Sequence, residues 1–360
     1  MLSRRLAAVA AALLLFGCSA PPAGDIRPTV ATAPVSHDPD DPAIWVNSAD
    51  PARSLILGTN KVAAPNGSLV VYGLDGKIRQ AIAPLDRPNN VDVEYSMMMP
   101  SGPIDIAVVT ERYKNRLRVY RVSPEGLADI SSGGGLPVFE GQQGDAAAPM
   151  GIALYRRNRD ATIFAIVSRK TGPRDGYLWQ YELFDDGAGR IKAAKVREFG
   201  AFSGVEIESI AVDDVLGYVY YSDTANGLHK YHADPDHPDA GRELAHFARD
   251  GYSADREGIA IYARANGSGY ILSTDQVAGN SRYHVFRREG KAGDPHDHSE
   301  LLKIVSGGAD STDGIDATSA SLGPQFPNGL LVVMNSREKN FLLFRWEDVA
   351  GLGPVKLALR

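Results

Sequence analysis

Three carboxylates stand close together near the start of the chain, in the segment HDPDDPAIW. Asp38, Asp40 and Asp41 lie within four positions and run directly into an apolar stretch. Like charges at this spacing repel one another, so a folded protein must neutralise them with a cation or bind them with hydrogen-bond donors. Calcium suits such a cluster because it takes about six to eight oxygen ligands in flexible geometry. The segment therefore indicates a cation-binding loop that leads into a β-strand.

The same kind of segment recurs along the chain. Short runs rich in valine, isoleucine and tyrosine alternate with turn residues, which favours an all-β fold. Six units of about 55 residues each begin a first strand with one landmark and end a second strand with another, 15–20 residues later. The first landmarks are Asp41, Asp92, Met150, Glu208, Glu257 and Asp316, and the second are Lys61, Arg112, Lys170, Asp223, Gln276 and Asn335. Six units of roughly four strands predict a six-bladed β-propeller.

A propeller would bring these landmarks together, because the innermost strand of every blade lines a central channel. Five of the first landmarks are carboxylates, and three of the second are cations. The alternative is that each acid caps a turn or binds backbone amides. A rim of acids and bases suits an anion that arrives with metal, above all phosphate, because metal ions bridge phosphate oxygens while lysine and arginine neutralise the phosphoryl group. Histidine is sparse at these positions, so zinc is not expected on the rim.

The chain resembles the β-propeller phytases in HDPDDPAIW, GTNK, NNVDVEY, ESIAVDD, DREGIAIY and STDGID. The resemblance runs from about His37 to Trp346. It implies a calcium-dependent phosphomonoester hydrolase that releases phosphate from phytate, myo-inositol hexakisphosphate. It also implies two neighbouring phosphate sites, one for cleavage and one for affinity, with water attacking phosphorus in line.

The resemblance further implies roles for individual residues. Lys61, Arg112 and Lys170 match cations that bind phosphate and take part in catalysis, and Glu208 matches a catalytic residue that also binds calcium. Asn280 and Arg282, in GNSRY, lie near the position of a second-site loop. The implied ligands of several calcium ions are Asp40, Asp41, Asp92, Glu208, Asp255, Glu257, Gln276, Asp313 and Asp316.

Three positions depart from the family pattern. Met150 stands where a tyrosine is expected, Thr171 where a glutamate is expected, and Asp223-Thr224 where two glutamates are expected. Each exchange removes a hydroxyl or carboxylate from the implied cluster, so weaker activity or a different phosphorylated substrate stays open. The alternatives from other classes are a non-catalytic propeller that binds inositol phosphates or a protein partner, and a calcium-dependent hydrolase of esters or lactones.

The N-terminus has the features of a signal peptide over residues 1–17. Arg4 and Arg5 precede an apolar stretch that is too short to span a bilayer. LFGC resembles a bacterial lipobox, which implies that Cys18, the only cysteine, becomes a lipidated first residue. Residues 18–36 are rich in proline, alanine and threonine and are expected to form a flexible tether, followed by the propeller over residues 37–360. The expected location is the cell envelope, lipid-anchored at the outer membrane or on the periplasmic side.

Charge and motifs narrow the possible partners. The chain has 38 cationic and 44 acidic residues, and loss of two arginines with the signal peptide leaves 36 cations, which argues against nucleic acid. The expected partner is a small-molecule substrate, calcium-phytate or another inositol phosphate. We expect a monomer that contacts the membrane only through its lipid. DPHDH is expected in an outer loop, YVYYSD in a strand core and WEDVAGLG in a helix.

Overall fold

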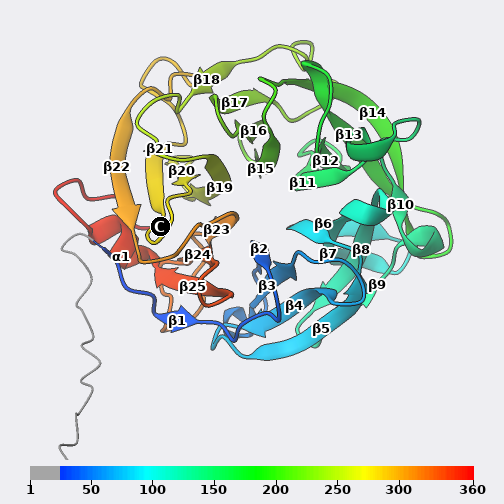
Figure 1. The fold of residues 1–360 in the computed structure, drawn as a ribbon, viewed down its shortest axis with the longest axis horizontal. Helices are drawn as coiled ribbons and strands as arrows, with labels where there is room; N and C mark the ends of the chain where they lie inside the picture. The colour runs from blue at the N-terminus through cyan, green and yellow to red at the C-terminus, as the bar shows by residue number, and fades with distance from the viewer. Residues whose placement is uncertain (1–24) are drawn as a thin grey trace, which may run out of the picture.

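The computed structural model describes residues 25–360, so the predicted signal peptide and Cys18 lie outside this part. Six antiparallel sheets surround a central axis (Figure 1), which confirms the predicted six-bladed β-propeller. Each sheet is a blade, numbered 1 to 6 in the chain order of its inner strand. Within every blade, the first three strands are neighbours in chain order and run outward from the axis.

The strands of blades 1 and 2 are β2 (Pro39–Trp45), β3 (Leu55–Asn60), β4 (Gly67–Gly73) and β5 (Ile78–Leu85), then β6 (Pro88–Met99), β7 (Gly102–Glu111), β8 (Arg116–Ser123), β9 (Gly126–Asp129) and β10 (Leu136–Pro137). Those of blades 3 and 4 are β11 (Pro149–Arg156), β12 (Ile163–Arg169), β13 (Asp175–Asp185) and β14 (Ile191–Ala201), then β15 (Ile207–Asp213), β16 (Tyr218–Asp223), β17 (Gly227–His232) and β18 (Ala245–Phe247). Those of blades 5 and 6 are β19 (Arg256–Ala263), β20 (Gly269–Asp275), β21 (Arg282–Arg287) and β22 (Leu301–Ser306), then β23 (Ile315–Thr318), β24 (Leu330–Asn335), β25 (Asn340–Arg345) and β1 (Val30–Ala31).

Burial explains the composition of these strands. The second strand of a blade is covered on both faces by neighbouring blades, and β3, β12, β20 and β24 are accordingly buried along their whole length. The outer strand β5 is mostly exposed. Tyr220 and Tyr221 of YVYYSD are fully buried in β16, and DPHDH lies between β21 and β22, so both predictions are confirmed.

The N-terminal segment closes the ring of blades. β1 pairs with β25 as the outermost strand of blade 6, with Val30 opposite Leu343, and the two ends of the propeller domain lie side by side (Figure 1). Ile26 is 5% exposed and packs into the core between blades 5 and 6. The prediction that the propeller starts at residue 37 is therefore corrected, because the described residues from 25 onward already belong to it.

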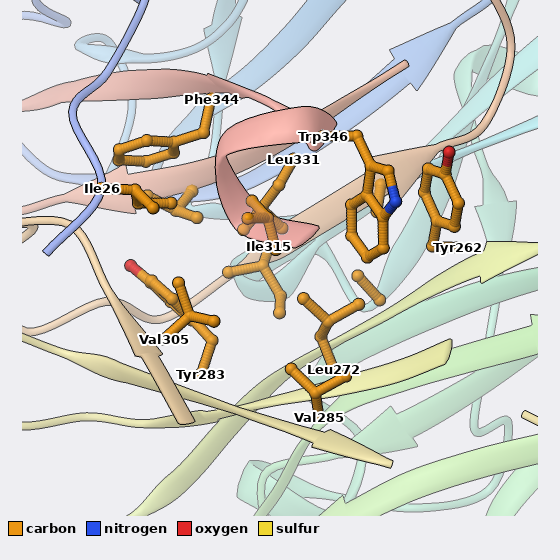
Figure 2. Packing of buried hydrophobic residues seen from close by; sticks show 14 of the residues in the cluster. Ile26, Tyr262, Leu272, Tyr283, Val285, Val305, Ile315, Leu331, Phe344 and Trp346 are labelled. Atoms are coloured by element: carbon orange, nitrogen blue, oxygen red, sulfur yellow. The ribbon is translucent and has the colours of Figure 1, made fainter. Parts of the chain in front are cut away.

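The last residues pack against the same core. The predicted helix is present as α1 (Trp346–Gly351). Figure 2 shows Trp346 face to face with Tyr262, and their ring centroids are 3.6 Å apart. The Trp346 indole donates a hydrogen bond to the Ala358 carbonyl at 3.1 Å, so the C-terminal segment is fixed on the blade 5–blade 6 core. Within residues 25–360, no helix has the length and apolar character needed to cross a bilayer.

Candidate active site

Five inner strands begin with the same irregularity. The register between first and second strand shifts by a β-bulge at equivalent places in blades 1 to 5. Such bulges re-aim side chains and are common beside active sites. The first residues inside the bulges are Asp40, Asn89, Met150, Glu208 and Glu257, and Asp313 takes this place in blade 6. We call these six residues the mouth row.

The mouth row corrects the predicted alignment of the blades. Glu208 and Glu257 were aligned with Asp41, Asp92 and Asp316, but the ladder register places Asp40, Asn89 and Asp313 beside them. Asp92 and Asp316 lie three residues further along their strands, and Asp41 lies one residue further. The blades converge tightly here, since a Cβ atom on Gly151 would lie 1.9 Å from the carbonyl oxygen of Glu208.

Asp41, Asp92 and Asp316 connect neighbouring blades along the channel wall. Their carboxylates accept hydrogen bonds from the backbone N–H groups of Val91, Leu154 and Ile44, at 3.0, 2.7 and 2.8 Å. The three acids line a channel cavity of about 230 Å³. Burial raises the pKa of Asp92 and of Asp316 to about 7. For Asp41, Asp92 and Asp316, the structure therefore shows the alternative named in the sequence analysis, in which the acid binds a backbone amide.

Two substitutions of Asp316 test whether this bridge needs an acceptor or a charge. Asp316→Ala leaves the Ile44 N–H without its acceptor, and we expect a loss of about 1–3 kcal/mol in the free energy of unfolding. Asp316→Asn keeps one oxygen acceptor for the Ile44 N–H but gives up the second oxygen, which accepts the Ala317 N–H at 2.7 Å, so its loss should be smaller than that of Asp316→Ala. Denaturant unfolding measures both. An equal loss in both variants would show that the charge itself is required, as expected of a metal ligand.

Three mouth-row carboxylates gather around Lys61 and Asn89. The Lys61 Nζ forms an ion pair with Asp40 and lies 3.6 Å from both Glu208 and Asp313. The Asn89 amide nitrogen donates to Glu208 at 2.6 Å and to Asp40 at 3.2 Å, while its Oδ1 is buried without a partner. Carboxylates from blades 1, 4 and 6 thus meet across the mouth of the channel.

The electrostatics of this cluster are unbalanced. Burial, together with Glu208 and Asp313, raises the pKa of Asp40 and of Glu257, and burial raises that of Asp313 to about 6. Burial acts in the same direction on Glu208, but Lys61, Asn89 and Arg112 hold its pKa below the ordinary value. Glu257 is 7% exposed, and its carboxylate has no hydrogen-bond partner within residues 25–360. One cation at Lys61 does not neutralise all four acids, so the cluster can accept further positive charge.

A second row of side chains follows the second strand of each blade. Backbone N–H groups at equivalent positions donate to the carbonyl of the residue just before each inner strand, with lengths from 2.7 to 3.1 Å. In blades 1 to 5 these positions hold Lys61, Arg112, Lys170, Thr224 and Gln276. We call them the rim row. Its cations lie on blades 1, 2 and 3, whereas the mouth-row acids lie on blades 4, 5, 6 and 1, so the site has a basic and an acidic side.

Arg112 stands out among the rim-row cations. Its side chain is largely buried, its Nε has no hydrogen-bond partner, and among residues 25–360 it forms no ion pair within 4.0 Å. Burial lowers the pKa of Arg112, although Glu208 opposes this. Lys170 by contrast forms an ion pair with Glu206. A buried guanidinium with free donors is suited to binding an anion.

Other predicted site residues make their contacts elsewhere or only at the margin. Gln276 donates to Asp313 and so belongs to the cluster, whereas the Asp255 side chain is exposed. Asn280 contacts Asp25 and Gly308, and Arg282 contacts Ser253 and Asp275. The structure brings neither Asn280 nor Arg282 into contact with the mouth row, and their binding role stays a prediction.

The structure adds three residues to the site. Asn89 lies in the mouth row, and Glu206 and Arg87 occupy equivalent positions just before the bulges of blades 4 and 2. The Arg87 guanidinium lies over the exposed Tyr113 ring, 5.6 Å from its centroid. An alignment of the repeats on Asp40 and Asn89, which lie one residue before Asp41 and three residues before Asp92, would have found them.

The departures from the family pattern also fall at this site. Met150 occupies the mouth-row position of blade 3 and is fully buried. The Thr224 hydroxyl is buried without a partner in the rim row of blade 4. Thr171 follows Lys170, and its backbone N–H donates to Asp145. Blade 3 therefore contributes a cation but no oxygen ligand from its mouth-row side chain.

Comparison with known proteins agrees with this arrangement. The model of the family described as Phytase matches residues 7–352. A 3-phytase of Bacillus subtilis (strain 168) is 31% identical over 326 residues, covering 86% of this chain and 80% of the relative. The solved β-propeller domain of Myceliophteria thermophila Cps50 (Swd1) has a TM-score of 0.47 at 11% identity, covering 84% of this chain and 82% of that one. BBS1N, in its complex with ARL6DN, has a TM-score of 0.46 at 11% identity, with coverage of 91% and 81%. At these TM-scores neither structure bears on function.

Proposed function

Because the chain belongs to the phytase family and is a phytase-type hydrolase, we propose that it releases phosphate from phytate at the channel mouth with bound Ca²⁺. The observation that supports this most is the division of the site into two sides. Rim-row cations on blades 1 to 3 face mouth-row carboxylates on blades 4, 5, 6 and 1. A phosphate group that is bridged by calcium needs both kinds of partner.

The donor set fits calcium. Asp40, Glu208, Glu257 and Asp313 offer only carboxylate oxygens, and the unpartnered Oδ1 of Asn89 adds an amide oxygen. Hard cations prefer such ligands, and calcium accepts them in irregular geometry. These five residues would hold the metal. Ca²⁺ supplies charge neutralisation at the phosphate oxygens and makes water more acidic.

The chain's own cations would orient the substrate. Arg112 presents unpaired donors to a phosphate, and Lys170 lies in the equivalent position one blade further. Lys61 bridges the two sides, because it already contacts three carboxylates and stands in the rim row. Hydrolysis breaks the ester P–O bond as water adds to phosphorus, and these cations stabilise the negative charge that builds on the phosphoryl oxygens.

An assay of phosphate release tests this function. Purified protein with excess Ca²⁺ should release phosphate from phytate, and Glu208→Gln should need more calcium for half-maximal rate. Tight binding of phytate without release would support the alternative, a receptor on a phytase scaffold, for which the oxygen-free Met150 in the mouth row is the specific argument. If the protein neither releases phosphate from phytate nor binds phytate, the hydrolase and the receptor are both refuted.

We also propose that the protein is lipid-anchored in the cell envelope. The support is the lipobox-like LFGC, in which Cys18 is the only cysteine of the chain. Cys18→Ser should move the protein from the membrane fraction to the soluble fraction of the expressing cells while its melting temperature stays the same. Unchanged membrane association would contradict the anchor.

A further inference from the structure

A second cluster of ligating side chains lies in the outer half of blade 4. His229 lies in β17 and His246 in β18, directly opposite each other in the ladder, and Glu243 precedes β18. One ligand atom of each residue lies within 4.8 Å of the other two. The cluster is separate in composition from the mouth row, which contains no histidine.

The two histidines face the same side of the sheet. Their rings stack with centroids 4.1 Å apart and planes 15° apart, and the His229 Nδ1 lies 2.6 Å from the Glu243 Oε2. Cross-strand neighbours on one face are close enough to share a ligand, and the two rings would turn out of their stack so that their in-plane nitrogen lone pairs converge on one ion. His229 is buried, His246 is half-buried and Glu243 is exposed, so the cluster has a protein-covered side and a side open to solvent.

The contacts around the cluster orient the His246 ring in the way that metal sites do. The His246 Nε2 donates to the Asn226 carbonyl at 2.9 Å, which leaves Nδ1 with a free lone pair. The His229 Nε2 is buried without a hydrogen-bond partner, and the nearest carboxylate is that of Asp223, at 3.9 Å. A metal-bound histidine commonly directs its second nitrogen at a carbonyl or carboxylate.

We propose that His229, Glu243 and His246 form a binding site for a divalent transition-metal ion of the Zn²⁺ class. Two imidazole nitrogens and one carboxylate oxygen match zinc ligation, with water completing the coordination on the open side. Calcium does not suit the site because it requires more oxygen ligands. On metal binding, the proton between the His229 Nδ1 and Glu243 would move to the His229 Nε2, beside Asp223, so that Nδ1 and the Glu243 carboxylate are both free to ligate.

The position of the site gives it a structural consequence. β18 is only three residues long, and these three residues make all of its pairing with β17, so its attachment to the blade is weak. A metal would link these two strands. The Asp223 carboxylate next to His229 also accepts hydrogen bonds from the Ser203 N–H and hydroxyl, at 2.8 and 2.6 Å. Ser203 belongs to the loop that carries Glu206, the partner of Lys170.

The test is a titration of metal-free protein with Zn²⁺, and with Co²⁺ as a spectroscopic probe, while saturating Ca²⁺ occupies oxygen-rich sites. We expect one Zn²⁺ per chain, visible Co²⁺ absorption bands, and a higher melting temperature with Zn²⁺. His246→Ala and Glu243→Gln should each weaken Zn²⁺ binding by at least about 10-fold. Glu243 is exposed, so its variant keeps the test decisive if His246→Ala does not fold.

The matched control is His237→Ala, which breaks another stacked histidine pair of the same blade, His232–His237, at 3.5 Å. This variant should bind Zn²⁺ as the wild type does. The proposal is overturned if the wild type takes up no Zn²⁺, if both site variants bind as tightly as the wild type, or if the control loses as much affinity as they do.

Discussion

Arg112→Met should reduce the turnover of calcium-phytate by at least about 100-fold, the usual scale for losing one electrostatic stabiliser of a transition state. Methionine keeps most of the apolar stem and removes only the guanidinium. That group is buried, has a free Nε and forms no ion pair with any residue in the 25–360 range, so its donors are available to the substrate. Because the charge on the phosphoryl oxygens grows in the transition state, kcat should fall more than KM rises.

Stability separates this prediction from a structural role. A buried, unpaired guanidinium costs solvation energy, so Arg112→Met should not lower the melting temperature. Arg118→Met is the matched control on the same blade, since Arg118 already pairs with Asp129 and Glu111 and lies outside the mouth. It should lower stability and keep wild-type turnover. If Arg112→Met keeps its turnover, or if added Ca²⁺ restores it, then Arg112 does not bind the phosphate.

The propeller itself could be predicted from the sequence because its signals are local. Each blade repeats apolar runs of strand length between turn residues, and the spacing of the repeats fixes their number. The pairing of the N-terminal segment with blade 6 was not predicted, for a physical reason. Val30 and Ala31 form only two residues of strand, and what holds them is pairing with Leu343 and Leu342 across the whole length of the chain. The proline- and alanine-rich sequence of this segment does not indicate that it pairs with β25.

The site was predicted in part, and the errors came from the register of the repeats, which was one residue off at Asp41 and three residues off at Asp92 and Asp316. The repeats correctly placed two mouth-row acids and three rim-row cations, which are Glu208, Glu257, Lys61, Arg112 and Lys170. Asp41 was taken as the landmark of blade 1, although Asp40 was also expected to bind calcium, and the bulge that turns Asp40 toward Lys61 leaves no mark in the sequence. Asp92 and Asp316 were predicted as calcium ligands because they are the acids in NNVD and STDGID. Their amide contacts to the next blade depend on the inner strands converging, which a single sequence does not reveal.

Removal of calcium should abolish phosphate release and lower the melting temperature. Carboxylates from blades 1, 4, 5 and 6 share the mouth row, and without metal their repulsion works against closure of the ring. A ligand that binds only the folded state stabilises by about 2.7 kcal/mol at a free concentration 100 times its Kd. For a protein of this size that corresponds to a loss of roughly 4 °C in melting temperature on removal. Calorimetry of metal-free and calcium-loaded protein measures the shift.

The effect should depend on pH in a direction set by Asp313. Burial raises its pKa in the folded protein to about 6, from 3.8, so between these values the metal-free folded state holds a proton that the unfolded chain has released. The free energy of unfolding of the metal-free protein should therefore decrease as pH rises through this window. Calcium needs the deprotonated carboxylate, so its stabilisation should be small near about pH 5 and large near about pH 8. Metal-free protein should be prepared by dialysis, because chelators weaken in acid.

Glu257→Gln is the matched variant: it removes a buried carboxylate that has no hydrogen-bond partner in the described chain, and it should raise the metal-free melting temperature while reducing the gain from calcium. A calcium effect that is equal at both pH values, or melting curves that coincide with and without calcium, would mean that the mouth row does not bind the ion.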